Sequence, residues 1–150
     1  MKSIPVADFV FGYGECAFAY CTSLTNVTVS DTYDMGKNVF IGCTGLQEVT
    51  IEWDEIGEYA FKDCTGITKV NLPENGCAVR MGAFYNCIAL NEITGLVSDV
   101  SEYSFYNCKK LVDASLAENM GGVGAYAYYG CTSLQEVTLG DGTYDFVVGD

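Results

Sequence analysis

Cysteine is the residue type in this chain best suited to chemistry, and its spacing decides which chemistry is open to it. The 150 residues include eight cysteines and no histidine. A cysteine nucleophile is commonly activated by a histidine, and cysteine-rich zinc sites are commonly built from CxxC pairs. The sequence has neither pattern. Instead, a cysteine follows an aromatic residue by three positions again and again, which favours a structural role.

Six copies of this short motif run along the chain. Each copy has an aromatic residue, two variable residues, Cys, two variable residues and Leu or Ile, as in "FKDCTGI" from Phe61 and "FYNCKKL" from Phe105. The aromatic residues recur every 21 to 23 residues. Such a period predicts stacked units that share one core. The expected inward ladder consists of Phe18, Phe40, Phe61, Phe84, Phe105, Tyr128, Cys21, Cys43, Cys64, Cys87, Cys108 and Cys131.

Two kinds of element must position this ladder. After each motif the apolar and polar residues alternate, as in "LQEVTI", which predicts a short half-buried strand. Before each cysteine a run such as "GECAFAYC" predicts about one helical turn, since it is too short for an independent helix. The fourth copy has Gly95 in place of an inward aliphatic residue and Arg80 in place of the usual glycine, so we expect a bulge or an altered turn there.

The stretch "IGEYAFKDCTGITKVNLP", from Ile56 to Pro73, resembles the BspA-like, or treponemal-type, leucine-rich repeat pattern "IGxxAFxxCxxLxxVxIPxxV". The resemblance covers about residues 12–140. It implies a right-handed α/β repeat solenoid of about six units in a single domain spanning residues 1–150. Residues 1–11 are then a partial unit or cap, and residues 141–150 a C-terminal cap or tail.

The outward side chains of the predicted strands form two polar columns. One interpretation is a solvated sheet face with hydroxyl ladders, and the other is a binding face, which solenoids commonly present. The carboxylates in these columns suit a basic partner or weak cation binding. The candidate binding face consists of Asn26, Thr28, Glu48, Thr50, Lys69, Asn71, Glu92, Thr94, Asp113, Ser115, Glu136 and Thr138.

A candidate aromatic patch lies on the segment that carries the cysteines. Tyr85, Tyr106 and Tyr129 each follow the aromatic residue of their motif, with Tyr59, Tyr103 and Tyr126 nearby. Tyrosine offers contact area at a low entropic cost, so an exposed cluster suggests a protein or glycan contact. The alternative is that the rings only cover gaps between units.

Composition narrows the classes of partner. Seven basic and twenty acidic residues give a net charge of −13. Nucleic acid is therefore a poor partner, and no apolar run is long enough to insert into a membrane. We expect no cofactor, no metal and no catalytic residue. Cys16 and Cys77 fall outside the ladder and are either exposed thiols or paired with another group.

The function that we predict is a non-enzymatic protein-binding or adhesion module. The family resemblance implies an extracellular or cell-surface location and a host or matrix protein as partner. The alternative is an intracellular scaffold or a structural spacer, which the unpaired cysteines favour. Pro5 and Asp8 interrupt the N-terminal apolar residues, so no signal peptide is expected. An uncapped solenoid exposes strand edges at its ends, which invites end-to-end self-association. We expect residues 1–12 and 141–150 to fold over these ends as caps.

Overall fold

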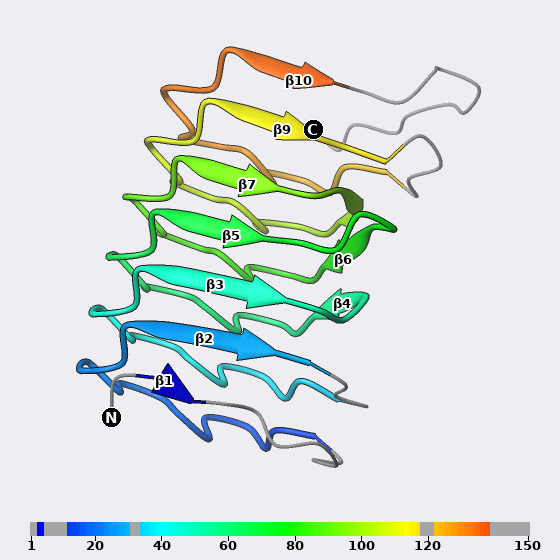
Figure 1. Cartoon of the computed structure of the whole chain (residues 1–150). Helices are drawn as coiled ribbons and strands as arrows, with labels where there is room; N and C mark the ends of the chain where they lie inside the picture. Colours follow the sequence, from blue (N-terminus) through cyan, green and yellow to red (C-terminus); the bar gives the residue numbers. More distant parts are fainter. Residues whose placement is uncertain (1–2, 5–11, 31–33, 118–121, 139–150) are drawn as a thin grey trace.

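The chain forms a β-solenoid in which successive coils stack along one axis (Figure 1). The computed structural model describes residues 3–4, 12–30, 34–117 and 122–138. The broad face of the solenoid is built from parallel strands in the order β1-β2-β3-β5-β7, followed by the pair β9 and β10. These strands are β1 (Ser3–Ile4), β2 (Asn26–Val29), β3 (Glu48–Ile51), β5 (Lys69–Asn71), β7 (Glu92–Thr94), β9 (Asp113–Ser115) and β10 (Glu136–Thr138).

The strands pair in register, so equivalent repeat positions lie directly above one another. Val27 pairs with Val49, Val49 with Val70, and Val70 with Ile93. The three valines are buried, whereas their neighbours in β2 and β3 alternate toward solvent. This alternation is the period-2 pattern expected of a strand with one buried face.

A second, three-stranded parallel sheet stands beside the first at the turn of the coil. It contains β4 (Glu55–Ile56), β6 (Cys77–Val79) and β8 (Val97–Val100) in that order. Its strands bury Ile56, Val79, Val97 and Val100. The sequence motif did not reveal this sheet, because its residues lie in the most variable part of the repeat.

The prediction of helical turns, and with it the α/β class, is wrong. Among the described residues there is no helix, and the segments before the cysteines are chains of turns. We call these segments arcs. The arcs are residues 15–20, 37–42, 58–63, 81–86, 102–107 and 125–130.

Left-handed residues explain why the arcs are not helical. Each arc holds two residues with φ between 52° and 78°, one two positions before the aromatic residue and one two positions after it. A right-handed helix cannot pass through such residues. The first position of each pair is occupied by Cys16, Asn38, Tyr59, Gly82, Tyr103 and Tyr126. The second is occupied by Tyr20, Gly42, Asp63, Asn86, Asn107 and Gly130.

In this backbone conformation, successive N–H groups donate alternately to the next arc and to their own arc. Phe40 donates its N–H to the carbonyl of Ala60 in the next arc at 2.8 Å, whereas Ile41 donates to Asn38 of its own arc at 3.1 Å. Every arc from the first to the fifth repeats this scheme. The arcs are therefore held to each other by backbone hydrogen bonds, as the strands are.

The fourth copy departs from the regular pattern, as its sequence predicts. The broad sheet is interrupted between β7 and β9, and Ile93 is only partly buried. Gly95 follows with φ of 82°, and a Cβ atom there would lie 2.1 Å from the carbonyl oxygen of Leu72. A residue with a Cβ atom would be strained and would clash here, so the backbone path that follows β7 requires glycine.

Stacked phenylalanine rings fill the centre of the coils. The ring centroids of Phe40 and Phe61 are 5.2 Å apart, those of Phe61 and Phe84 are 5.4 Å apart, and those of Phe84 and Phe105 are 5.5 Å apart. These four rings are buried. Phe18 and Tyr128 continue the stack at its two ends, where they are partly buried.

The strand β1 continues the broad sheet beyond β2, since Ser3 pairs with Asn26 and Ile4 with Val27. The predicted caps, residues 1–11 apart from β1 and residues 141–150, lie outside the described residues.

Candidate functional site

The cysteine column is a hydrogen-bonded part of the core. Each thiol from Cys43 onward donates to the backbone carbonyl oxygen of the aromatic residue in the preceding coil. Cys64 donates to Phe40 at 3.0 Å and Cys108 to Phe84 at 3.2 Å. Cys43, Cys87 and Cys131 repeat this contact at 3.1 to 3.2 Å. A thiol is small, apolar and a weak donor, so it fits this buried position.

Burial makes Cys87 and Cys108 unreactive. It raises the pKa of Cys87, and burial together with the neighbouring Cys131 thiol raises the pKa of Cys108. Because the thiolate is the reactive form, neither group is suited to catalysis or to metal binding.

Three cysteines do not follow the ladder. Cys21, which the sequence predicts to pack inside, is exposed. Cys16 is also exposed. Cys77 lies in the second sheet, where burial, with smaller effects from Asp54 and Glu55, raises its pKa to about 12. The described cysteines are all free thiols.

In the middle of the two polar columns on the broad sheet, the side chains form hydrogen bonds and an ion pair with one another. The Asn71 amide donates to the Glu48 carboxylate at 2.8 Å, and Thr94 donates to the Asn71 side-chain oxygen at 3.0 Å. Lys69 forms an ion pair with Glu92 at 3.0 Å. These contacts link β3, β5 and β7, so this part of the columns stabilises the stack.

At the two ends of the polar columns, the side chains are more open to solvent. Asn26 and Thr28 are exposed on β2. On the other side of the interruption, Asp113 pairs in register with Glu136, so two carboxylates stand opposite each other on exposed positions. Thr50 lies partly buried beneath the Asn71 amide, Ser115 is exposed, and of Thr138 only its place in β10 is described.

The tyrosines of the last three arcs form one continuous aromatic surface. Tyr85 stacks on Tyr106 with ring centroids 4.7 Å apart, and Tyr106 stacks on Tyr129 at 5.2 Å. A second column beside it stacks Tyr103 on Tyr126 at 5.4 Å. We call these five residues the tyrosine face.

The two columns of the tyrosine face also touch each other. Tyr103 meets Tyr106 at 5.8 Å, and Tyr126 meets Tyr129 edge to face at 5.9 Å. Tyr126 is 48% exposed and Tyr129 is 59% exposed. Stacking holds the rings in place before any partner arrives, and the exposure of Tyr126 and Tyr129 leaves these two rings available to it.

Lysine side chains border the tyrosine face at its N-terminal edge. The ammonium of Lys62 lies 5.3 Å from the ring centroid of Tyr85 and 5.5 Å from that of Tyr59. Lys37 approaches Tyr59 from the previous coil at 5.3 Å. These distances are typical of cation–π contacts.

A ladder of hydrogen-bonded side-chain amides lies beside the tyrosine face and was not predicted from the sequence. The Asn107 side-chain amide donates to the Asn86 oxygen at 2.7 Å, and the Asn86 amide donates to the Asp63 carboxylate at 2.9 Å. All three residues have left-handed backbones. The preference of Asn and Asp for that conformation was the available signal, but it becomes visible only once the arcs are known to contain such positions.

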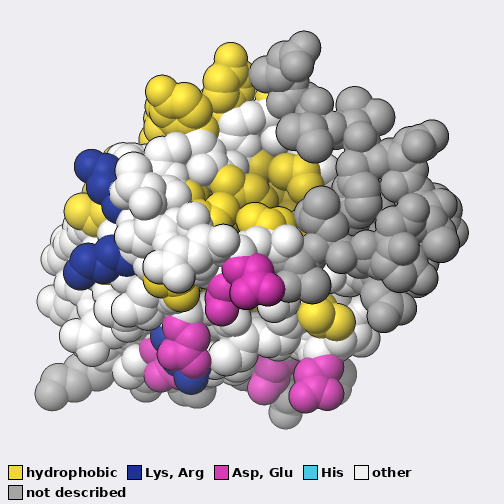
Figure 2. Space-filling model, turned by 90° about the horizontal axis from the view of Figure 1, so that it is seen from above, with side chains coloured by type: hydrophobic (Ala, Val, Ile, Leu, Met, Phe, Trp, Pro, Cys, Tyr) yellow, Lys and Arg dark blue, Asp and Glu magenta, His cyan; other side chains and the backbone are white. Residues whose placement is uncertain are grey.

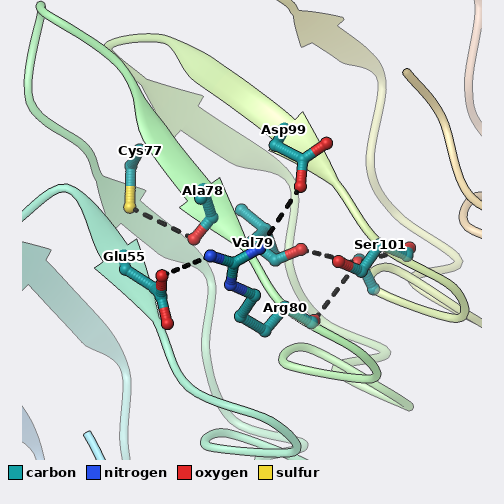
Figure 3. A network of polar contacts seen from close by, with 8 residues as sticks. Glu55, Cys77, Ala78, Val79, Arg80, Asp99 and Ser101 are labelled. Atoms are coloured by element: carbon teal, nitrogen blue, oxygen red, sulfur yellow. Dashed lines mark hydrogen bonds and ion pairs between the residues drawn. The ribbon is translucent and has the colours of Figure 1, made fainter. Parts of the chain in front are cut away.

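Arg80 organises the second sheet around the irregular fourth copy (Figure 3). Its guanidinium donates a hydrogen bond to Glu55, at the start of β4, and its other terminal nitrogen lies 3.5 Å from Asp99 in β8. Figure 3 shows the arginine reaching between the two carboxylates. The cluster joins three consecutive coils. Arg80, which stands where most repeats have glycine, thus contacts Glu55 in the preceding coil and Asp99 in the following one.

The described ranges contain no group of three or more His, Cys, Asp or Glu side chains placed to hold a metal ion. Within the same ranges, no helix has the length and apolar character needed to cross a bilayer.

Comparison with protein families identifies the repeat. The model of the BspA type leucine rich repeat region matches residues 1–54 and 33–146, with 6 copies. Comparison with curated proteins gives no match.

Solved bacterial structures share the fold. A leucine-rich repeat protein from Eubacterium ventriosum ATCC 27560 superposes with a TM-score of 0.72 at 21% identity, covering 82% of this chain and 34% of that one. A leucine-rich repeat protein from Bacteroides ovatus ATCC 8483 gives 0.64 at 25% identity, covering 85% and 40%. A leucine rich cell surface protein from Faecalibacterium prausnitzii A2-165 gives 0.62 at 24% identity, covering 95% and 48%.

The chain thus spans less than half the length of each of these three proteins. Repeat families of this kind are generally non-enzymatic and commonly take part in protein interactions.

Proposed function

Because this chain belongs to the BspA type leucine-rich repeat family, we propose that it is a non-enzymatic protein-binding module of a microbial surface protein. The contact surface that we propose is the tyrosine face. The surface location is supported by the family and by the similarity to a bacterial cell surface protein of the same fold.

The observation that carries the proposal is the pre-stacked arrangement of the five tyrosines, in which Tyr126 and Tyr129 are exposed and the other three are partly buried. Tyr126 and Tyr129 leave about half of their surfaces open to solvent. Aromatic residues are enriched at the centres of protein interfaces, where a rigid ring loses little entropy on binding. Stacking in the free chain removes most of the remaining side-chain freedom in advance.

The strand columns are the second candidate surface, and a specific observation favours only their C-terminal part. Asp113 and Glu136 face each other across neighbouring strands, and like charges directly opposite destabilise a sheet. A basic group on a partner would relieve that repulsion. In contrast, Glu48, Lys69 and Glu92 already have partners within the stack.

Free cysteines do not by themselves favour the alternative of an intracellular scaffold. Most of them are buried in the described chain, where they are shielded from oxidants. Cys16 and Cys21 are the exposed ones. A structural spacer without its own ligand is the remaining alternative.

The test compares two sets of variants in pull-downs from extracellular-matrix proteins and from cytosolic proteins. The first set replaces Tyr106 and Tyr129 with Ser, and the second replaces Glu48, Glu92 and Glu136 with Lys. We expect specific capture of a matrix protein that the tyrosine variant loses, whereas the lysine variant, which keeps the rings but carries less negative charge, binds it only more weakly.

Three other outcomes would change the assignment. Loss of binding only in the lysine variant would move the site to the strand columns. Capture of cytosolic proteins alone would favour the scaffold. Capture from neither mixture, by a chain whose circular dichroism shows it folded, would favour the spacer.

A further inference from the structure

The tyrosine columns already bind a cation at one end. Lys62 occupies, in the third arc, the repeat position that Tyr85, Tyr106 and Tyr129 occupy in the following arcs. Its ammonium lies 5.3 Å from the Tyr85 ring and so closes the N-terminal end of that column. The same ammonium lies 5.5 Å from the ring centroid of Tyr59 in its own arc.

The C-terminal end of the tyrosine columns presents the same kind of ring faces. Among the described residues, no lysine or arginine lies over these rings. Tyr126 stacks on Tyr103, and Tyr129 stacks on Tyr106. The side of each ring away from this stack is open, and the two residues are 48% and 59% exposed. The two rings meet at 71°, with centroids 5.9 Å apart, and so form the two walls of a corner. Figure 2, which looks onto this end, shows hydrophobic side chains protruding at the edge opposite the acidic ones.

We infer that this corner, formed by Tyr126 and Tyr129, binds an arginine or lysine side chain from a basic segment of the partner protein. The inference rests on the proposed function, because it names the chemistry of the protein that the tyrosine face contacts. The negative face of a tyrosine ring attracts a cation, and two rings at a steep angle can contact it together.

The charge of the chain selects a basic partner. With twenty acidic and seven basic residues, the protein attracts cationic segments and repels anionic ones. The last two coils also carry Asp113 and Glu136 on their strands. The same −13 charge disfavours a second copy of this chain as the occupant, since two copies repel each other.

The size of the surface indicates a segment of chain as the occupant. A stable interface between two folded proteins uses roughly 20–30 residues on each side. The tyrosine face has five described tyrosines across three arcs, which suits a short, extended and basic stretch of polypeptide.

The test uses two synthetic peptides in titrations followed by calorimetry and by NMR of the tyrosine rings. One peptide is a glycine–serine chain carrying three arginines, and the other carries citrulline, the neutral isostere, at those positions. We expect the arginine peptide to bind and to shift the ring signals of Tyr126 and Tyr129. The citrulline peptide should bind at least about fivefold more weakly, since a neutral group lacks the cation–π attraction.

Matched variants distinguish the contribution of the two rings to peptide binding from that of the chain's overall negative charge. Replacing Tyr126 and Tyr129 with Leu leaves the charge unchanged and should weaken arginine-peptide binding about 4- to 25-fold, from about 2- to 5-fold per ring. The corresponding Phe variant keeps both ring faces and should stay within about twofold of the parent. Tyr20→Leu removes an exposed tyrosine at the opposite end of the solenoid and should have no effect.

Two results would overturn the inference. One is equal binding of the arginine and citrulline peptides, and the other is unchanged affinity in the Leu variant. If the parent chain captures a matrix protein while the peptides ignore the corner, the inference fails and the proposed function stands. If the peptides bind the corner but no protein is captured from either mixture, the proposed function fails instead.

Discussion

The thiol of Cys64 donates a hydrogen bond of 3.0 Å to the backbone carbonyl oxygen of Phe40, one coil earlier in the solenoid. The same oxygen accepts the N–H of Cys43 at 3.2 Å, so one carbonyl is shared by its own coil and the next. This relationship recurs along the column and explains why a cysteine, rather than another small residue, follows the aromatic residue by three positions.

We predict that Cys64→Ala lowers the free energy of unfolding by about 1–3 kcal/mol. The change removes a buried donor and leaves a small cavity in the stack. Urea unfolding followed by circular dichroism measures this loss. Cys16→Ala, at an exposed cysteine, should change stability by less than about 0.5 kcal/mol. Equal stability of the two variants would show that the thiol hydrogen bond contributes nothing.

The protein should lose stability at alkaline pH. Burial raises the pKa of Cys87 and Cys108 above the ordinary value of 9.0, and it raises the pKa of Cys77 to about 12. Above pH 9 the unfolded chain loses these protons while the folded chain keeps them. Stability is therefore fully present below about pH 9 and falls as pH rises, up to about pH 12 for Cys77.

Unfolding curves at a series of pH values from 8 to 10.5 measure this slope. Each thiol with a raised pKa adds up to about 1.4 kcal/mol per pH unit. Cys87→Ala should make the slope shallower, whereas Cys16→Ala should leave it unchanged. A stability that is flat across this range would contradict the raised pKa values.

Gly57→Ala should destabilise the fold by more than about 1 kcal/mol. A Cβ atom at Gly57 would lie 2.1 Å from the carbonyl oxygen of Met35, so the backbone of two coils would have to separate. Gly14 holds the same repeat position in the first coil but has no atom within 4 Å of such a Cβ. Gly14→Ala is thus the matched control and should be tolerated; if both variants unfold at the same temperature, close packing of the coils is not the reason for glycine.

Arg80→Met should destabilise the protein by about 0.5–1 kcal/mol in low salt, and less in high salt. The substitution removes contacts with Glu55 and Asp99 that are partly exposed, and such pairs are weak and screened. Lys37→Met, which removes the more open contact with Glu58 at 3.6 Å, serves as the comparison. Thermal melts at two salt concentrations measure both effects, and an Arg80 effect independent of salt would mean that packing rather than charge is lost.

The regular part of the fold could be predicted from the sequence because each coil repeats it. The alternation around Val49 and Val70 and the recurrence of Phe61 and Phe84 identify stacked strands and a shared core. The irregular fourth copy was also visible, since Gly95 interrupts the apolar pattern.

The arcs could not be predicted, because their shape depends on backbone angles that residue types indicate weakly. Tyr59 and Tyr103 occupy left-handed positions, although tyrosine has no marked preference for them. Hydrogen bonds to the next arc hold that conformation, and these exist only after stacking. The sequence therefore suggested a helical turn where the structure has alternating turns. The aromatic patch was predicted in part, but the contact between its two columns needs the arc geometry.

The central claim is that this chain binds a protein partner through the tyrosine face, and amide hydrogen exchange with and without a captured partner tests it most directly. We predict slower exchange in the partner's presence within the arcs at 102–107 and 125–130, with little change in β3, β5 and β7. Slower exchange confined to those strands, with the two arcs unaffected, would contradict it.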